Sequence, residues 1–189
     1  LATIDGSVIT SHTDDSHRTR SSIFIQPAKD YAPGAMCDIT RRVPCDTFAM
    51  PLYVYDKIGE IPQVSHTHAY VNSAYPCINE HQLAIGESTF GGREQLQSDK
   101  GLIDCTMLCQ LMIERCTTAQ EAIKLAEELT AKYGYNDAGE CLTIADTKEV
   151  WNFEILGPGK GQVGSIWVAQ RVPDDEVAVN ANASRIRKI

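Results

Sequence analysis

The feature that most constrains the fold is a pair of apolar runs that flank a short polar corner. The runs cover residues 69–78 and 83–89, and the corner, residues 79–82, reads Asn-Glu-His-Gln. This pattern predicts two buried strands joined by a tight turn, with Asn79 at the bend. An asparagine there can take a positive φ and hydrogen-bond the turn, or it can offer its side-chain amide to an oxyanion. The local pattern alone favours the turn.

Length and composition indicate one globular domain over residues 1–189. A chain of 189 residues can bury a sizeable core, and its 43% apolar and 22% charged residues are typical of such domains. The net charge of −8 argues against a nucleic-acid partner, whose phosphates require Lys and Arg. Because no apolar run is long enough to span a membrane and no leader is visible, we expect no membrane partner. The acidic composition favours the cytoplasm over the periplasm or secretion.

The cysteines and a histidine pair are the residues best suited to metal or disulfide chemistry. Seven cysteines are scattered without a C-x-x-C pair, which suggests neither a zinc site nor a disulfide framework. Three of them, Cys105, Cys109 and Cys116, share a helical face and are expected to be buried as small hydrophobic residues. His66 and His68 have a metal-ligand spacing on an extended strand, but no third ligand is near in the sequence. We therefore expect packing or solvent exposure for these histidines, no metal and no cofactor.

Strand signals outnumber helix signals along the chain. A first helix is expected over residues 101–116, and a second begins at the capping box Thr118-Ala-Gln-Glu121 and ends at Gly134. Residues 36–51 predict an irregular excursion or an edge hairpin. Further strands are expected at residues 7–11, 22–26, 52–55, 141–145, 149–155, 165–169 and 176–180. The pattern predicts an α+β chain with two central helices on a mostly antiparallel sheet.

A polar cluster follows the first expected strand, where Asp14 and Asp15 lie between His12 and His17. Two adjacent carboxylates flanked by histidines after a strand end are candidate catalytic or ligand-binding residues. A solvated loop has the same composition, and composition alone favours the loop.

Four stretches together resemble the dipeptidase A family of cysteine dipeptidases, which belong to the N-terminal-nucleophile hydrolases. The segment beginning Asn-Glu-His-Gln-Leu at Asn79 resembles the Asn-Glu-x-x-Leu/Val segment of these enzymes. Residues 2–17, 134–151 and 172–186 agree with it in order and spacing. The resemblance implies a four-layer α-β-β-α sandwich, of which this chain would be about the N-terminal half.

The resemblance also implies an activity, the hydrolysis of dipeptides through an acyl-enzyme. In these dipeptidases the nucleophile is the cysteine that begins the mature chain, and its own α-amine acts as the base. No cofactor is implied, dipeptides are the expected substrates, and a homo-oligomer is left open.

Asp15 and His12 carry the resemblance near the start of the chain. Asp15 matches the acidic residue that contacts the amine of the nucleophile. Related acylases have an Arg-Asn-x-Asp segment here, whereas residues 12–15 read His-Thr-Asp-Asp. The aspartate matches and the arginine does not, which puts a substrate-binding arginine in doubt. His12 is instead a candidate substrate-binding residue.

Later positions supply the expected amides of the site. Asn79 matches the asparagine of the oxyanion hole, and Asn182 matches a second amide near the nucleophile. Asn180 competes with Asn182 for that role. Glu80 is the second candidate substrate-binding residue.

The expected cysteine should lie shortly upstream of the Asp5-Gly6 turn, but the first residue is Leu1. A chain trimmed at both ends, a cleaved precursor and a relative that lost the nucleophile are the open explanations. We favour trimming because Leu1 enters in the middle of an expected hairpin, and this chain alone would then be inactive.

Three other functions compete with the dipeptidase. The alternatives are an amidase or acylase of the same fold acting on a non-peptide amide, and a non-catalytic binding relative. A metallopeptidase built on His66, His68 and Asp14 or Asp15 is the weakest.

Overall fold

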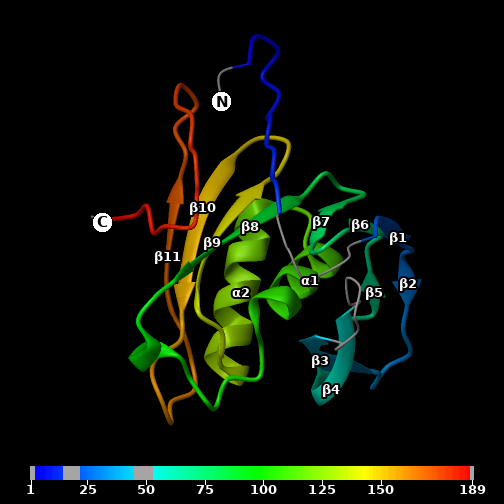
Figure 1. Cartoon of the computed structure of the whole chain (residues 1–189). Helices are drawn as coiled ribbons and strands as arrows, with labels where there is room; N and C mark the ends of the chain where they lie inside the picture. Colours follow the sequence, from blue (N-terminus) through cyan, green and yellow to red (C-terminus); the bar gives the residue numbers. More distant parts are fainter. Residues whose placement is uncertain (1–2, 15–21, 45–52, 188–189) are drawn as a thin grey trace.

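The structure, a computed structural model, describes residues 3–14, 22–44 and 53–187. Its centre is a seven-stranded antiparallel sheet (Figure 1). Across this sheet the strands follow the order β1 (Phe24–Gln26), β6 (Tyr70–Asn72), β7 (Pro76–Asn79), β8 (Ala84–Gly91), β9 (Gly139–Ala145), β10 (Val150–Leu156) and β11 (Ile166–Arg171). Two smaller antiparallel pairs are β2 (Lys29–Asp30) with β5 (His66–Thr67), and β3 (Met36–Pro44) with β4 (Tyr53–Pro62). A single 3-10 turn, η1 (Glu94–Leu96), follows β8.

Both expected helices are present and have side-chain caps. In α2 (Ala119–Tyr133), Thr118 and Glu121 form the predicted capping box, and Gly134 ends the helix with φ 75°. The first helix, α1 (Cys105–Arg115), begins four residues later than predicted because Asp104 is its N-cap and accepts from the Met107 amide. Residues 101–104 instead pair with the chain that leaves α2, where the Ile103 amide donates to the Gly134 carbonyl. Neither helix is long and apolar enough to cross a membrane.

The helices pack against one face of the central sheet, as Figure 1 shows. Strand residues Ile85, Leu142 and Ile144 share one buried core with residues of both helices, and the three cysteines predicted on the face of the first helix are buried in this core. Because side chains alternate along a strand, the residues between them point to the opposite face. We call that opposite face the outer face; Gly86, Ser88, Thr143, Asn152 and Glu154 lie on it.

The structure corrects three strand predictions. Of the two alternatives for residues 36–51, the hairpin is the one observed, because residues 36–44 pair with residues 53–62 as β3–β4. The strand predicted at residues 52–55 is therefore part of a longer strand. Residues 7–11 and 176–180 are extended but form no strand, because no neighbouring backbone pairs with them among the described residues. They lie over the outer face, where Val8 and Ala178 pack on Ala145 and Val150. The described residues form one helix layer on one sheet, so the four-layer sandwich stays a prediction.

Two carboxylates are buried on the helix side of the sheet. Thr89 Oγ1 lies 2.8 Å from Glu87 Oε1 and 3.0 Å from Glu140 Oε1. Burial, followed by the neighbouring Glu87 carboxylate, raises the pKa of Glu140 to about 10. A hydroxyl has one hydrogen to donate, so both contacts are satisfied when Glu140 is protonated and donates to Thr89.

The raised pKa of Glu140 predicts a dependence of stability on pH. Between the unfolded pKa near 4.5 and the folded pKa of about 10, the folded chain keeps a proton that the unfolded chain releases. The free energy of unfolding therefore falls as pH rises, by up to about 1.4 kcal/mol per pH unit for one proton. Glu140→Gln has no such proton to lose, so urea unfolding at about pH 5 and about pH 8 should show a shallower fall than the wild type. The exposed Glu128→Gln is the control, and equal slopes in wild type and Glu140→Gln would contradict the assignment.

Candidate active site

The two terminal segments of the described chain border one cleft on the outer face. Its volume is about 540 Å³, and residues 9–13 and 177–182 form its walls. The floor comes from Gly86 and Ser88 of β8 and from Thr143 of β9. Candidate residues predicted from opposite ends of the sequence thus meet above the middle of the sheet.

His12 lies directly on β8. Its Nε2 is 2.5 Å from the Glu87 carbonyl oxygen, so this nitrogen carries the hydrogen and Nδ1 is the acceptor in the neutral ring. The close approach requires a glycine beneath the ring, because a Cβ added to Gly86 would lie 3.2 Å from His12 Cβ and Cγ. The absence of a side chain at Gly86 therefore positions His12 in the cleft.

Asn182 is held on the same strand in a left-handed conformation, with φ 35°. Its backbone amide donates to Ser88 Oγ at 2.9 Å, and its side-chain Nδ2 donates to the Thr89 carbonyl at 2.8 Å. Asparagine tolerates this conformation better than most residues, and such backbone geometry gathers at functional sites. Among the described residues, Thr89 accepts one of the two amide hydrogens and leaves the second for the cleft.

Asn180 is bound more deeply than Asn182. Its Nδ2 donates to Thr143 Oγ1 at 2.8 Å and to Asn152 Oδ1 at 3.0 Å. Its Oδ1 is buried and has no hydrogen-bond partner among the residues that the structure describes. A buried acceptor without a partner costs about 1–3 kcal/mol, so this atom is a candidate for a donor that enters the cleft.

The other predicted asparagine, Asn79, does not line this cleft. Its Nδ2 donates to the Ile113 and Cys116 carbonyls at the end of α1, at 2.8 Å each. Its Oδ1 accepts from the His81 and Leu83 amides at 3.0 and 3.1 Å. All four hydrogen-bonding positions of the amide are therefore used, two within the turn and two at the end of α1, and the positive φ belongs to Gln82, at 64°. This geometry supports the role of Asn79 in the turn. Its role in an oxyanion hole stays a prediction, because both hydrogens of its amide already bind carbonyls at the end of α1.

The remaining candidates lie elsewhere. Asp15 falls outside the described residues. Glu80 does not line the cleft and accepts from the Ala69 amide at 2.8 Å. The structure brings together His12, Asn180 and Asn182 and does not bring Asn79 and Glu80 to them.

Two polar residues of the outer face, which support the segment that borders the cleft, were missed in the sequence. Asn152 and Glu154 alternate with apolar residues along β10, and the period of two puts both on one face. Glu154 is 5% exposed and accepts from Ser184 Oγ at 2.6 Å and from the Arg185 and Ile186 amides. This alternation was the signal that could have located the outer face.

Comparison with known proteins decides the family. The sequence pattern of peptidase family C69 matches residues 1–189. The chain belongs to peptidase family C69. A curated relative from Latilactobacillus sakei named "Probable dipeptidase" is 34% identical over 118 residues, which cover 59% of this chain and 23% of the relative. The dipeptidase A resemblance seen in the sequence is thereby confirmed, and the chain aligns with about a quarter of that relative.

Four of the cysteines that the structure describes in this family C69 chain have a raised pKa. Burial is the main reason that the pKa of Cys37 and of Cys77 is raised. It raises the pKa of Cys116 and of Cys141 to about 12. A thiol must ionise to act as a nucleophile, so none of these four is suited to that role.

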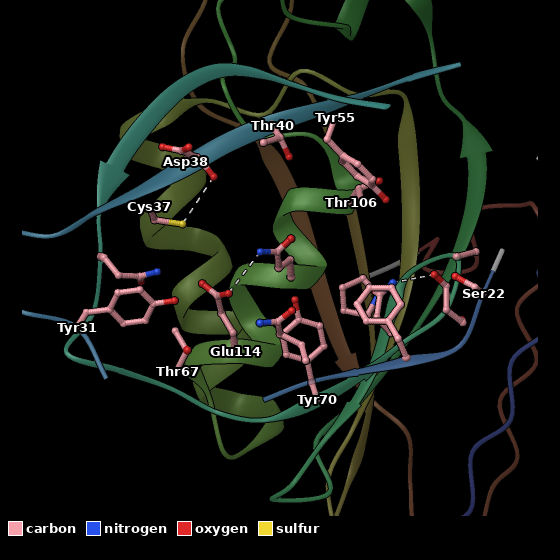
Figure 2. A pocket seen from close by; sticks show the side chains of 18 of the residues that line it. Ser22, Tyr31, Cys37, Asp38, Thr40, Tyr55, Thr67, Tyr70, Thr106 and Glu114 are labelled. Atoms are coloured by element: carbon pink, nitrogen blue, oxygen red, sulfur yellow. Dashed lines mark hydrogen bonds between the residues drawn. The ribbon is translucent and has the colours of Figure 1, made fainter. Parts of the chain in front are cut away.

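A second hollow, of about 680 Å³, lies between the β3–β4 hairpin and α1 (Figure 2). Tyr31, Tyr55 and Tyr70 line it together with Glu114, a buried acid. Burial raises the pKa of Glu114, although Arg115, at 3.2 Å, opposes the rise. Of the site residues predicted from the sequence, those that the structure describes do not line this hollow.

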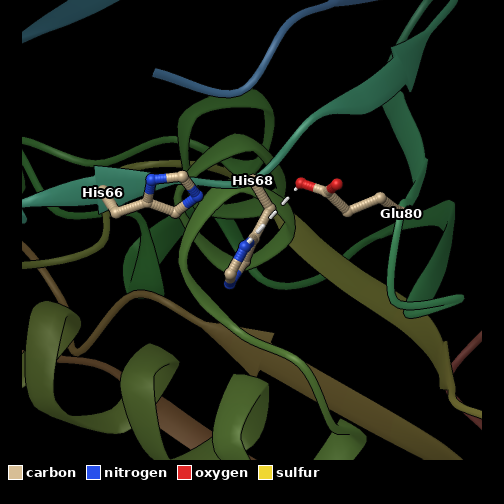
Figure 3. Close-up of side chains that lie close together, drawn as sticks. All are labelled: His66, His68 and Glu80. Atoms are coloured by element: carbon tan, nitrogen blue, oxygen red, sulfur yellow. Dashed lines mark ion pairs between the residues drawn. The ribbon is translucent and has the colours of Figure 1, made fainter. Parts of the chain in front are cut away.

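His66, His68 and Glu80 lie close together at the corner beside the Asn79 turn (Figure 3). The third ligand that was not evident beside the histidines in the sequence is therefore Glu80, twelve residues after His68, brought back by the β6–β7 hairpin. Burial, and then the neighbouring His81 and His66, lower the pKa of His68, which favours its neutral ring.

The turn role of Asn79 predicts a large loss of stability on its truncation. Asn79→Ala leaves two amides and two carbonyls without their partner, and the free energy of unfolding should fall by at least about 2 kcal/mol. Urea denaturation measures this loss. Asn72→Ala is the matched control, because among the described residues the Asn72 side chain makes one hydrogen bond, to the Ser73 carbonyl. Wild-type stability in Asn79→Ala would contradict the structural role.

Proposed function

We propose that this chain is the N-terminal part of a dipeptidase and that the outer-face cleft is part of its active site. Membership of peptidase family C69 and the relative named "Probable dipeptidase" support peptide-bond hydrolysis. The observation that carries the location is the meeting of His12 with Asn180 and Asn182 over Gly86. The sequence resemblance singled out all three residues without reference to their positions in space.

The proposed nucleophile is an N-terminal cysteine that precedes Leu1 in the mature parent protein. Its α-amine removes the thiol proton, and the thiolate sulfur attacks the carbonyl carbon of the peptide bond. The tetrahedral intermediate collapses, the amine returns the proton to the leaving nitrogen, and the first amino acid is released. Water then attacks the thioester, with the amine again as base, and releases the second amino acid. The reaction consumes one water and requires no cofactor.

The chain's own residues would serve this reaction by position. The second amide hydrogen of Asn182 would stabilise the oxyanion that forms on the carbonyl oxygen. The buried Asn180 Oδ1 would accept from the protonated α-amine or from the substrate amide, which supplies the partner it lacks. His12 lines the cleft, and its Nδ1 would accept from the ammonium group of the dipeptide. Asp15 is proposed to contact the α-amine of the nucleophile.

The test begins with the longest product of the gene. The mass of its mature N-terminus is measured, and dipeptide hydrolysis is assayed before and after treatment with a thiol alkylator. We expect an N-terminal cysteine, and we expect alkylation of that residue to abolish hydrolysis because the thiolate is the nucleophile. An active protein whose N-terminus is not cysteine, or whose activity survives full alkylation, would contradict the mechanism.

A variant in the same active protein tests the cleft itself. Asn182→Ala should lower kcat by about 10²-fold or more, the usual effect of removing one oxyanion donor. Gln120→Ala is the control, because it removes an exposed amide on α2 that bonds only Glu149 among the described residues. Equal kcat values for the two variants would remove Asn182 from the proposed machinery.

A further inference from the structure

Three of the five histidines of this chain gather at one corner of the fold, away from the outer-face cleft. His66 belongs to β5, His68 follows it, and His81 comes from the turn between β7 and β8. The ring centroids of His66 and His68 are 5.5 Å apart, and those of His68 and His81 are 4.4 Å apart. Glu80 completes the group from the same turn.

His66, His68 and Glu80 have ligand atoms close enough to bind one ion, and His81 lies beside His68. His81 Nε2 lies 3.2 Å from His68 Nδ1, and Glu80 Oε1 lies 4.0 Å from the same nitrogen. One ligand atom each from His66, His68 and Glu80 fit within 4.8 Å of one another. A tetrahedral zinc ion with bonds of 2.0–2.1 Å holds its ligand atoms about 3.3 Å apart. The His68 and His81 nitrogens already meet this distance, and rotation of the exposed His66 and Glu80 side chains would bring the remaining ligand atoms closer.

The Asp30 carboxylate fixes the tautomer of His66 that can bind a metal ion. Asp30 Oδ1 lies 2.6 Å from His66 Nδ1, across the β2–β5 pair. The hydrogen on Nδ1 leaves Nε2 as a lone-pair donor, and a carboxylate in this position is the usual support of a metal-binding histidine.

The backbone under the remaining ligands is also fixed by hydrogen bonds. The His68 amide donates to the Glu114 carbonyl at 2.8 Å, and the Glu80 amide donates to the Ala69 carbonyl at 3.0 Å. The Asn79 side chain accepts from the His81 amide. The ligands are thus carried by a hydrogen-bonded frame rather than by a free loop, which favours a defined site.

We propose that His66, His68, His81 and Glu80 bind one zinc-type divalent ion that joins β5 to the turn between β7 and β8. Three imidazoles and one carboxylate suit Zn²⁺, and four protein ligands are typical of a closed, structural site. The ion would stabilise the corner where the helix end, the turn and the β2–β5 pair meet. The site is separate from the proposed hydrolytic cleft, and neither proposal depends on the other.

Zinc binding to the chelator-treated chain tests this proposal. Equilibrium dialysis with Zn²⁺ alone, followed by elemental analysis, should give one zinc per chain, and the Tm should rise because the ion binds only the folded form. His68→Gln and His81→Gln should each weaken binding at least about tenfold, since even second-shell changes cost about 10–100-fold. Asp30→Asn should weaken it by a similar factor without removing a ligand.

His12→Gln is the matched control, because it removes a histidine that lies on the outer face. We expect its zinc affinity to equal that of the wild type. Circular dichroism of the metal-free variants verifies that each is folded, and Asp30→Asn changes a side chain that is 89% exposed. A wild-type chain that binds no zinc, or affinities that are equal in all variants, would overturn the proposal.

Discussion

The candidate active site depends on how one buried carboxylate is satisfied. Glu154 lies on the outer face of the sheet, where an unpaired charge would cost several kcal/mol. A hydroxyl and two backbone amides from residues 184–186 supply its hydrogen bonds and so fix the C-terminal segment on the sheet. Asn180 and Asn182 belong to this segment, and their own bonds to β8, β9 and β10 follow from its path. The hydrogen bonds of Glu154 therefore fix the segment that borders the cleft on the polar outer face.

A second set of constraints operates around Asn79. Its side chain joins the turn after β7 to the end of α1, which fixes the sheet against the helix layer. The same turn presents Glu80 and His81 beside the histidines of β5 and the chain that follows it. One asparagine thus builds a corner that serves packing and, in our proposal, metal binding. The hydrolytic chemistry is assigned to the opposite face, where the strands offer polar groups and a glycine.

Local patterns predicted the parts of the fold that depend on local physics. The capping box of α2, the strands at residues 141–145 and 149–155 and the turn at Asn79 are set by neighbouring residues and were found. Residues 7–11 and 176–180 have strand composition, but a strand also requires a partner backbone, which sequence alone does not show. His12 and Asn182 were named from the sequence and share a cleft. The use of the Asn79 amide by α1 and the return of Glu80 to His68 are long-range contacts, and neither leaves a local signal.

The most direct test of the account is the structure of the longer parent protein after inactivation by a thiol-reactive dipeptide analogue. The account predicts a covalent adduct on the N-terminal cysteine, with its acyl oxygen beside Asn182 and its amino end near His12, above Gly86. The larger, tyrosine-lined hollow between β3–β4 and α1 should then contain no adduct. An adduct bound in that hollow, or on a cysteine within residues 3–187, would contradict the placement of the active site on the outer face.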